Sequence, residues 1–263
     1  MLIESNEKYI PSLISLWHKA FGDDEEYIKL FFDKAYYDCE CFAEIVGDEA
    51  VSAFYLLKCS IKKDGRMYNG RYLYAAATLP EYRSKGLMSK LIKEALDYGK
   101  SKALSFIALV PADDGLYDYY SRFGFYQAMY KYSYAPKKDI VTLRAFAEIT
   151  DCNEFIRIRN SYKGDMLIYN DVCNEYAFDS LRFAGTRIFY LNDNAYYAEG
   201  EELFCSDEDN SFITDTLINN IRDDSAVYTN CNIDSAEKIR NGMIYCFDNE
   251  AELKDIYMNI ALD

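Results

Sequence analysis

The feature that most constrains this chain is the segment 78–89, which joins a β-pattern to a strongly helical pattern that runs to Ser101. The join contains Arg83, Lys85 and Gly86 directly before the helical pattern. The first N–H groups of a helix have no partner within the helix and carry a partial positive charge. A strand, a loop with glycine and cations, and a helix in this order therefore predict a phosphate-binding site.

Length and composition indicate one large or two modest domains with a full hydrophobic core. The chain has 263 residues, of which 50% are hydrophobic. It contains no apolar run of about 18 residues, as a membrane helix needs, and its first residues lack the basic and apolar regions of a secretory signal. We therefore expect a cytoplasmic protein that has no membrane partner.

The cysteines do not form a metal-binding pattern. Only Cys39 and Cys41 are close together, no C-x-x-C pair occurs, and His18 is the one histidine. We therefore expect no metal site, reduced and mostly buried thiols, and a structural role for His18. The eight cysteines are Cys39, Cys41, Cys59, Cys152, Cys173, Cys205, Cys231 and Cys246.

The negative charge is concentrated in the second half. Residues 1–139 hold 19 basic and 20 acidic residues, whereas residues 140–263 hold 10 and 24 of the total net charge of −15. This distribution argues against nucleic acid, whose phosphates require a basic surface. It would favour a cationic substrate or partner, but an acidic surface that only aids solubility is the simpler explanation.

Periodicity predicts two α/β units joined near residues 136–139. In the first unit we expect helices over 7–21 and from Asp23, followed by strands over 41–46, over 50–59 and from Met67 or Arg71 to Thr78, with a turn at Asp64-Gly65. A helix over 87–101, a strand over 104–110, a helix over 113–122 and a strand over 125–134 complete this unit. In the second we expect a helix over 152–161, strands over 186–191, 195–198 and 202–205, a helix over 211–221, strands over 226–230 and 243–247, and a helix over 250–260.

Three motifs in the first unit resemble the GNAT (GCN5-related N-acetyltransferase) family. Residues 83–88 (RSKGLM) match the first and fourth positions of the family's pyrophosphate loop, R/Q-x-x-G-x-G/A. Residues 78–82 (TLPEY) match the lead-in V-x-P-E-Y, and residues 119–125 (YYSRFGF) match F-Y-x-x-x-G-F. Met88 departs from the loop's small sixth residue, and this departure favours the family's Eis-like branch.

The resemblance implies an α/β (α+β) architecture with a mixed central sheet flanked by helices. It covers 1–136, which we expect to be the acetyltransferase domain. Residues 137–263 would then form a second, degenerate GNAT-like α/β domain, as in the tandem Eis-like branch, because they contain no pyrophosphate loop. The chain is too short for the sterol-carrier-like domain that this branch usually carries.

The resemblance further implies acetyl-CoA as the co-substrate. Alanines before the loop are the small residues that would let the cofactor approach the strand, although close packing of a helix explains them equally well. We expect the strand to separate from its parallel neighbour near Ala108, so that its free backbone groups bind pantetheine. The implied cofactor-binding residues are Ala76, Ala77, Thr78, Arg83, Ser84, Lys85, Gly86, Leu87, Met88 and Ser89.

Tyr120 matches the tyrosine that acts as general acid in the family, with Tyr119 as the alternative and Tyr117 further from the motif. The general base stays open among Glu44, Asp113, Asp114, the terminal carboxylate of Asp263 and a chain of waters. The resulting hypothesis is transfer of an acetyl group to a primary amine on a small cationic molecule. The alternative is a non-catalytic acyl-CoA-binding sensor or assembly module.

Overall fold

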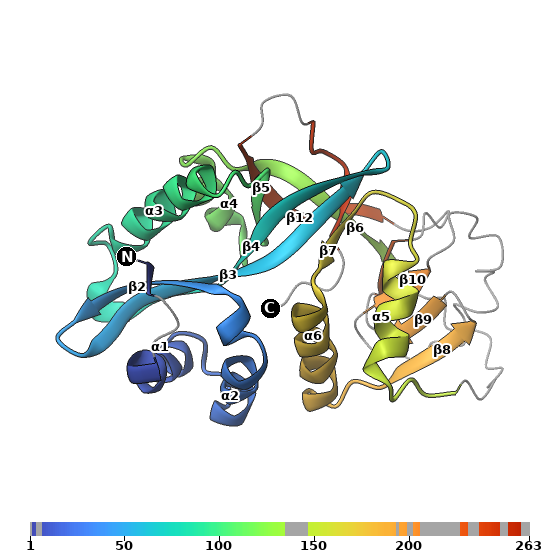
Figure 1. Cartoon of the computed structure of the whole chain (residues 1–263), viewed down its shortest axis with the longest axis horizontal. Helices are drawn as coiled ribbons and strands as arrows, with labels where there is room; N and C mark the ends of the chain where they lie inside the picture. Colours follow the sequence, from blue (N-terminus) through green and yellow to red (C-terminus); the bar gives the residue numbers. More distant parts are fainter. Residues whose placement is uncertain are drawn as a thin grey trace.

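Both halves of the chain contribute strands to one continuous sheet, with helices packed on its two faces (Figure 1). The computed structural model describes residues 2–3, 7–134, 147–192, 195–198, 202–205, 227–230, 237–247 and 252–258. Within these residues, no helix is long and apolar enough to cross a membrane.

The elements of the first half agree closely with the periodicity. The helix predicted over 87–101 has these same bounds, and the expected turn at Asp64 and Gly65 is present with φ of 49° and 73°. The helices are α1 (Ile10–Phe21), α2 (Glu25–Lys34), α3 (Leu87–Ser101) and α4 (Asp114–Ser121). The strands are β1 (Leu2–Ile3), β2 (Glu40–Val46), β3 (Glu49–Lys63), β4 (Arg66–Thr78), β5 (Phe106–Leu109) and β6 (Tyr126–Tyr134).

The second half agrees less well. Its helices are α5 (Cys152–Asn160) and α6 (Asp171–Phe183), and its strands are β7 (Met166–Tyr169), β8 (Ile188–Asn192), β9 (Ala195–Ala198), β10 (Glu202–Cys205), β11 (Val227–Thr229), β12 (Glu237–Cys246) and β13 (Ile256–Tyr257). The periodicity missed β7 and α6, and the helix expected over 211–221 lies outside the described residues. The helix expected over 250–260 is wrong, because β13 lies within that range and is paired with β6 and β7.

The sheet crosses the boundary expected at residue 136. The strands run in the order β1-β2-β3-β4-β5-β12-β6-β11-β10-β9-β8, so β12 of the second half lies between β5 and β6 of the first. Ile244 is paired with Ala108 on one side and with Tyr126 on the other. Residues 1–134 therefore do not form a complete sheet by themselves.

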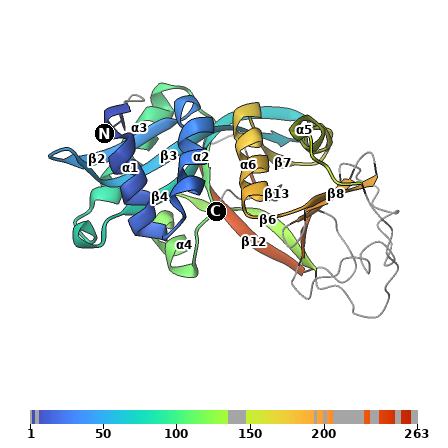
Figure 2. The ribbon, with the colours of Figure 1, turned by 90° about the horizontal axis from the view of Figure 1, so that it is seen from below.

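The two faces of the sheet carry separate cores. Alternate residues of β3 point to opposite faces, so Tyr55 packs with α1, α2 and α6, whereas Phe54 packs with α3 and α4. The views from two sides show α1 and α2 on the face opposite α3 (Figures 1 and 2). This arrangement confirms the predicted mixed sheet flanked by helices.

A gap opens within the sheet between its two parallel neighbours. β4 and β5 are paired only through Gly70–Phe106, Arg71–Ile107 and Tyr72–Ala108. Beyond Tyr72 the two strands separate, as expected near Ala108. The backbone of β4 after Tyr72 therefore has β3 as its partner on one side only.

Candidate active site

The loop before α3 has the backbone conformation of an anion-binding site. Ser84 and Gly86 both have left-handed backbones, with φ of 60° and 78°. Gly86 is the N-terminal cap of α3, and no side chain there bonds the first N–H groups of the helix. Left-handed residues beside the start of a helix turn successive N–H groups toward one concave side, which suits a phosphate.

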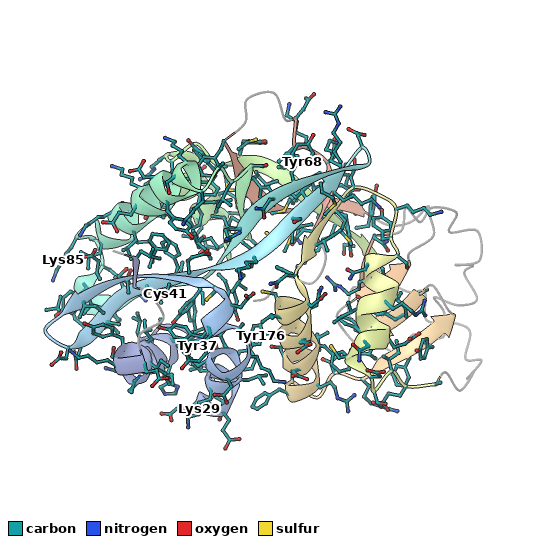
Figure 3. The ribbon with its side chains drawn as sticks, in the orientation of Figure 1. Lys29, Tyr37, Cys41, Tyr68, Lys85 and Tyr176 are labelled. Carbon is teal, nitrogen blue, oxygen red and sulfur yellow. The ribbon has the colours of Figure 1, made fainter. Side chains whose placement is uncertain are left out.

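Two cations lie on this loop. Arg83 Nε donates to the carbonyl oxygen of Thr78 at 3.1 Å, which fixes the side chain against the end of β4. Lys85 Nζ lies 4.7 Å from the ring centre of Tyr82, and the side chain extends to the outer edge of the molecule (Figure 3). Both are exposed, so they can add charge to an anion in the loop without competing ion pairs among the described residues.

Met88 does not crowd the loop. Its side chain is partly buried against the core beneath α3, and the next residue, Ser89, shares a hydrogen bond of 3.1 Å with the Tyr119 hydroxyl on α4. The space around Gly86 is open, with no atom within 4 Å of the position that a Cβ would occupy. Glycine is therefore favoured at 86 by its φ rather than by lack of space.

A bulge interrupts β4 where it separates from β5. Ala53 pairs with Ala77 and Tyr55 pairs with Tyr74, so Ala75 and Ala76 together face one residue of β3. Ala75 has a φ of 50°, a conformation that costs an L-residue roughly 1–2 kcal/mol. Bulges commonly re-aim backbone groups beside active sites, and this one turns the strand at the wall of a cavity.

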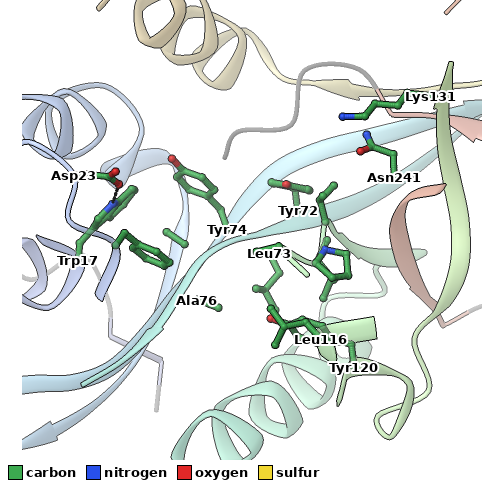
Figure 4. Close-up of a pocket in the computed structure, with 16 residues that line it drawn as sticks. Trp17, Asp23, Tyr72, Leu73, Tyr74, Ala76, Leu116, Tyr120, Lys131 and Asn241 are labelled. Atoms are coloured by element: carbon green, nitrogen blue, oxygen red, sulfur yellow. Dashed lines mark hydrogen bonds between the residues drawn. The ribbon is translucent and has the colours of Figure 1, made fainter. Parts of the chain in front are cut away.

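The cavity has a volume of about 600 Å³ and passes between the separated strands (Figure 4). Tyr72 and Tyr74 in its wall belong to the core on the α1 face, whereas Leu73 and Tyr120 belong to the core on the α3 face. The cavity therefore connects the two faces of the sheet. Its lining is Trp17, Phe21, Asp23, Tyr72, Leu73, Tyr74, Ala75, Ala76, Leu109, Val110, Pro111, Ala112, Leu116, Tyr120, Lys131 and Asn241.

Tyr120 is the tyrosine of α4 that reaches this cavity. It is 6% exposed and packs against the rings of Tyr119 and Phe125, with centroids 5.2 Å and 5.9 Å away. Burial raises the pKa of the Tyr120 hydroxyl well above its ordinary value. Its hydroxyl has no hydrogen-bond partner within the described ranges, so it can donate to a ligand.

The neighbouring tyrosines are engaged elsewhere. The Tyr119 hydroxyl bonds Ser89, and the Tyr117 ring lies under the Arg240 guanidinium at 4.2 Å. Neither is among the described residues that line the cavity. The geometry thus separates Tyr120 from the two alternatives that the sequence left open.

The proposed bases do not line the cavity. Glu44 is paired with Lys90, Asp113 caps α4 by accepting from Leu116 N at 3.0 Å, and Asp114 is paired with Arg240. Asp263 lies outside the described residues. Each described candidate therefore has a structural partner, and none faces the space between the strands.

Asp23 is a carboxylate in the cavity wall that the sequence indicated only as part of a helix start. Its Oδ2 accepts from Trp17 Nε1 at 2.7 Å, and its carbonyl oxygen accepts from His18 Nδ1 at 2.7 Å. Gly22, with a φ of 81°, ends α1 and turns the chain back so that Asp23 reaches Trp17. The sequence signal for this position is Gly22, a glycine that ends a helix, followed directly by an acidic residue.

Comparison with known proteins supports the GNAT fold that the sequence motifs suggested. Residues 2–128 match the family model described as an acetyltransferase (GNAT) domain. A search of curated proteins finds no match.

Several solved structures share the fold over nearly the whole chain. Eis1 from Mycobacterium abscessus is 10% identical, with a TM-score of 0.65, over 95% of this chain and 74% of its own. A GCN5-related N-acetyltransferase from Anabaena variabilis is 16% identical, with a TM-score of 0.65, over 94% and 73%. A proposed acetyltransferase from Pyrococcus horikoshii is 15% identical, with a TM-score of 0.62, over 99% and 94%.

At these identities the structural likeness concerns the fold alone, whereas the family model concerns the sequence of the first half. The two agree on the segment that carries β4, the loop, α3 and α4. Residues 2–128 therefore belong to the GNAT acetyltransferase superfamily.

Proposed function

We propose that this protein is an acetyl-CoA-dependent N-acetyltransferase that acts on a primary amine. The observation that carries the proposal is the cavity between β4 and β5, which is lined by Tyr120 and by Ala75 and Ala76 of the bulge, on the strand that leads into the loop before α3. Because the cavity joins the two faces of the sheet, two substrates can enter from opposite sides and meet at its centre.

The α3 face supplies the binding site for acetyl-CoA. Backbone N–H groups over 84–89 would hold the pyrophosphate, with Arg83 and Lys85 adding positive charge. The backbone of Ala76, Ala77 and Thr78 has no β5 partner, so it can pair with the pantetheine amides as an added strand would. The side chains of Ala76 and Ala77 leave room for that approach.

The reaction is direct attack of the amine nitrogen on the thioester carbonyl carbon. A C–N bond forms, the C–S bond breaks, and the departing sulfur takes a proton. Tyr120 is suited to supply that proton, since it lines the cavity and, like any tyrosine with an ordinary or raised pKa, is protonated at neutral pH. The amine's own proton passes to water, directly or through Asp23, which is the carboxylate in the described lining of the cavity.

The opposite end of the cavity suits a small cationic acceptor. It combines the Asp23 carboxylate with the rings of Trp17 and Tyr74. Ring faces and a carboxylate both stabilise an ammonium group. From the described part of the acidic second half, Asn241 is the residue that lines the cavity, and it lies beside Lys131 rather than beside Asp23 (Figure 4).

Thiol release tests the proposal. Acetyl-CoA is incubated with a panel of small amines, free CoA thiol is followed with a disulfide reagent, and the acetylated product is identified by its mass. We expect turnover with at least one cationic amine. Calorimetry with acetyl-CoA runs in parallel: binding without turnover on any amine favours the non-catalytic acyl-CoA binder, and absence of binding contradicts both functions.

A further inference from the structure

We propose that Tyr176, on α6 of the second half, is a positioning residue for the acceptor end of the cavity, and that it acts through Tyr74. This inference rests on the proposed function. It gives the second half a defined part in substrate binding, although α6 does not itself line the cavity.

The first step is a direct bond between the halves. The hydroxyl groups of Tyr74 and Tyr176 lie 2.9 Å apart, and both residues are buried, with 4% and 0% exposure. Figure 4 shows the Tyr74 hydroxyl pointing from β4 toward the helix above it, away from the centre of the cavity. Figure 3 places Tyr176 on the side of α6 that faces the first half.

The second step is the ring packing around Tyr74. Trp17 meets Tyr74 edge to face at 5.4 Å, and Phe31 packs against both Tyr74 and Tyr176, with ring centroids 5.6 Å and 5.5 Å away. A tyrosine ring held at its hydroxyl and on its sides has one orientation. That orientation sets the wall that faces Trp17 and Asp23.

The third step is the position of Tyr74 along β4. It directly precedes Ala75, the left-handed residue of the bulge, and it belongs to the core on the α1 face. The loop that would bind the pyrophosphate begins beyond the end of β4 and leads into α3, on the other face of the sheet. A displaced Tyr74 ring therefore disturbs the acceptor more than the cofactor.

The experiment compares Tyr176→Phe with Tyr169→Phe in the full chain. Tyr169 is also buried in the second half, its ring meets the cavity residue Tyr72 at 5.6 Å, and its hydroxyl has no hydrogen-bond partner among the residues that the structure describes. The control thus removes the same atom next to the same cavity without breaking a bond. Steady-state kinetics are measured for the amine and for acetyl-CoA separately.

We expect Tyr176→Phe to raise the amine KM about five- to thirty-fold, with a much smaller change in the acetyl-CoA KM and in kcat. Tyr169→Phe should change neither KM. Tyr74→Phe breaks the same bond from the other side, so the effects of the two variants should be clearly less than additive in the double variant. Equal effects on both KM values, or additive effects of the two single variants, would overturn the proposal.

A second readout does not depend on turnover. Trp17 is the one tryptophan of the chain and lies in the cavity wall, so its fluorescence reports the packing of Tyr74 directly. Tyr176→Phe should shift the emission and increase quenching by acrylamide, whereas Tyr169→Phe should leave both unchanged. An unchanged Trp17 signal refutes the positioning role, while a wild-type protein that is inactive on every amine refutes only the proposed function.

Discussion

Glu44 on β2 and Lys90 on α3 form an ion pair, with Oε1 2.8 Å from Nζ. Glu44 is one of the carboxylates that the sequence suggested as a general base, and it is engaged in this pair. Burial alone would raise the pKa of Glu44, but the hydrogen bonds and positive charges around it, those of Lys90 among them, together outweigh burial and lower that pKa. A paired carboxylate with a lowered pKa is a poor acceptor for an amine proton.

Glu44→Gln should therefore leave kcat and both KM values within a factor of about two of the wild type. The Lys90 side chain is 56% exposed, and solvent screens exposed pairs, so the free energy of unfolding should change little. Denaturant melts and thiol-release kinetics measure the two effects. A large fall in kcat that is restored by raising the pH would instead make Glu44 the base.

Tyr120→Phe should lower kcat about a hundred-fold or more, because a positioned general acid contributes roughly 10²–10⁴. Binding of acetyl-CoA, followed by calorimetry, should be kept. Burial raises the Tyr120 pKa, so the wild-type rate should show no alkaline loss from this group below about pH 10. The comparison variant is Tyr119→Phe, which breaks only the bond to Ser89 and should retain most activity.

Gly86→Ala should weaken acetyl-CoA binding. The alanine must adopt a φ of 78°, at a cost of roughly 1–2 kcal/mol, and relief of that strain distorts the loop. We expect a several-fold rise in the acetyl-CoA KM without a change in the amine KM. Gly65→Ala in the β3–β4 turn imposes a similar strain at a φ of 73°. It should therefore lower the melting temperature by about as much as Gly86→Ala does, but leave both KM values unchanged.

A fragment of residues 1–136 should not fold. In the full chain β12 pairs with both β5 and β6, and Met243 and Ile244 of β12 are buried in the cores on opposite faces. Removal of β12 opens the sheet and exposes both cores. The fragment should lack a cooperative melting transition and should not bind acetyl-CoA. A cooperative melt would show that the first half is an independent domain.

Acid should destabilise the fold through Glu40. Arg71 Nε and Nη2 donate to the two oxygens of Glu40 at 2.8 Å and 2.9 Å, and the Tyr98 hydroxyl donates to one of them at 2.7 Å. Burial opposes ionisation of Glu40, but these hydrogen bonds outweigh it and lower its pKa.

The Glu40 contribution is therefore complete above the unfolded pKa of about 4.3 and is lost as the pH falls through the lowered folded value. Glu40→Gln should cost about 3 kcal/mol at neutral pH and should reduce the loss of stability on acidification. Urea melts between neutral pH and about pH 3 measure both. An equal acid dependence in the variant and the wild type would mean that other carboxylates control it.

Sequence patterns predicted those elements whose structure depends on residues close together in the chain. Leu91, Ile92 and Ala95 lie on one face at helical spacing, and the helix that they predict has the observed bounds. The Asp64-Gly65 turn and the motif over 119–125 that contains Tyr120 are also recognised within a few residues. The fold class and the family followed from these segments.

Non-local pairing was beyond the sequence. The pattern of β12 indicates a strand but not that its neighbours are β5 and β6, which lie far earlier in the chain. Ile256 and Tyr257 fall within the stretch over 250–260 that was expected to be a helix, yet they form a buried strand between β6 and β7. Asp23 reaches the cavity only because Gly22 reverses the chain, and no periodicity predicts where a turn directs the next side chain.

The place of β12 also sets the order of events during synthesis. Ribosomes release a chain from its N-terminus, and domains made of local strands can fold as they emerge. Here the partner that β5 and β6 share is β12, so the central sheet can close only after residues 237–246 have been made. Until then the edges of β5 and β6 lack this partner, and unpaired strand edges are the sites at which unfinished chains pair with one another.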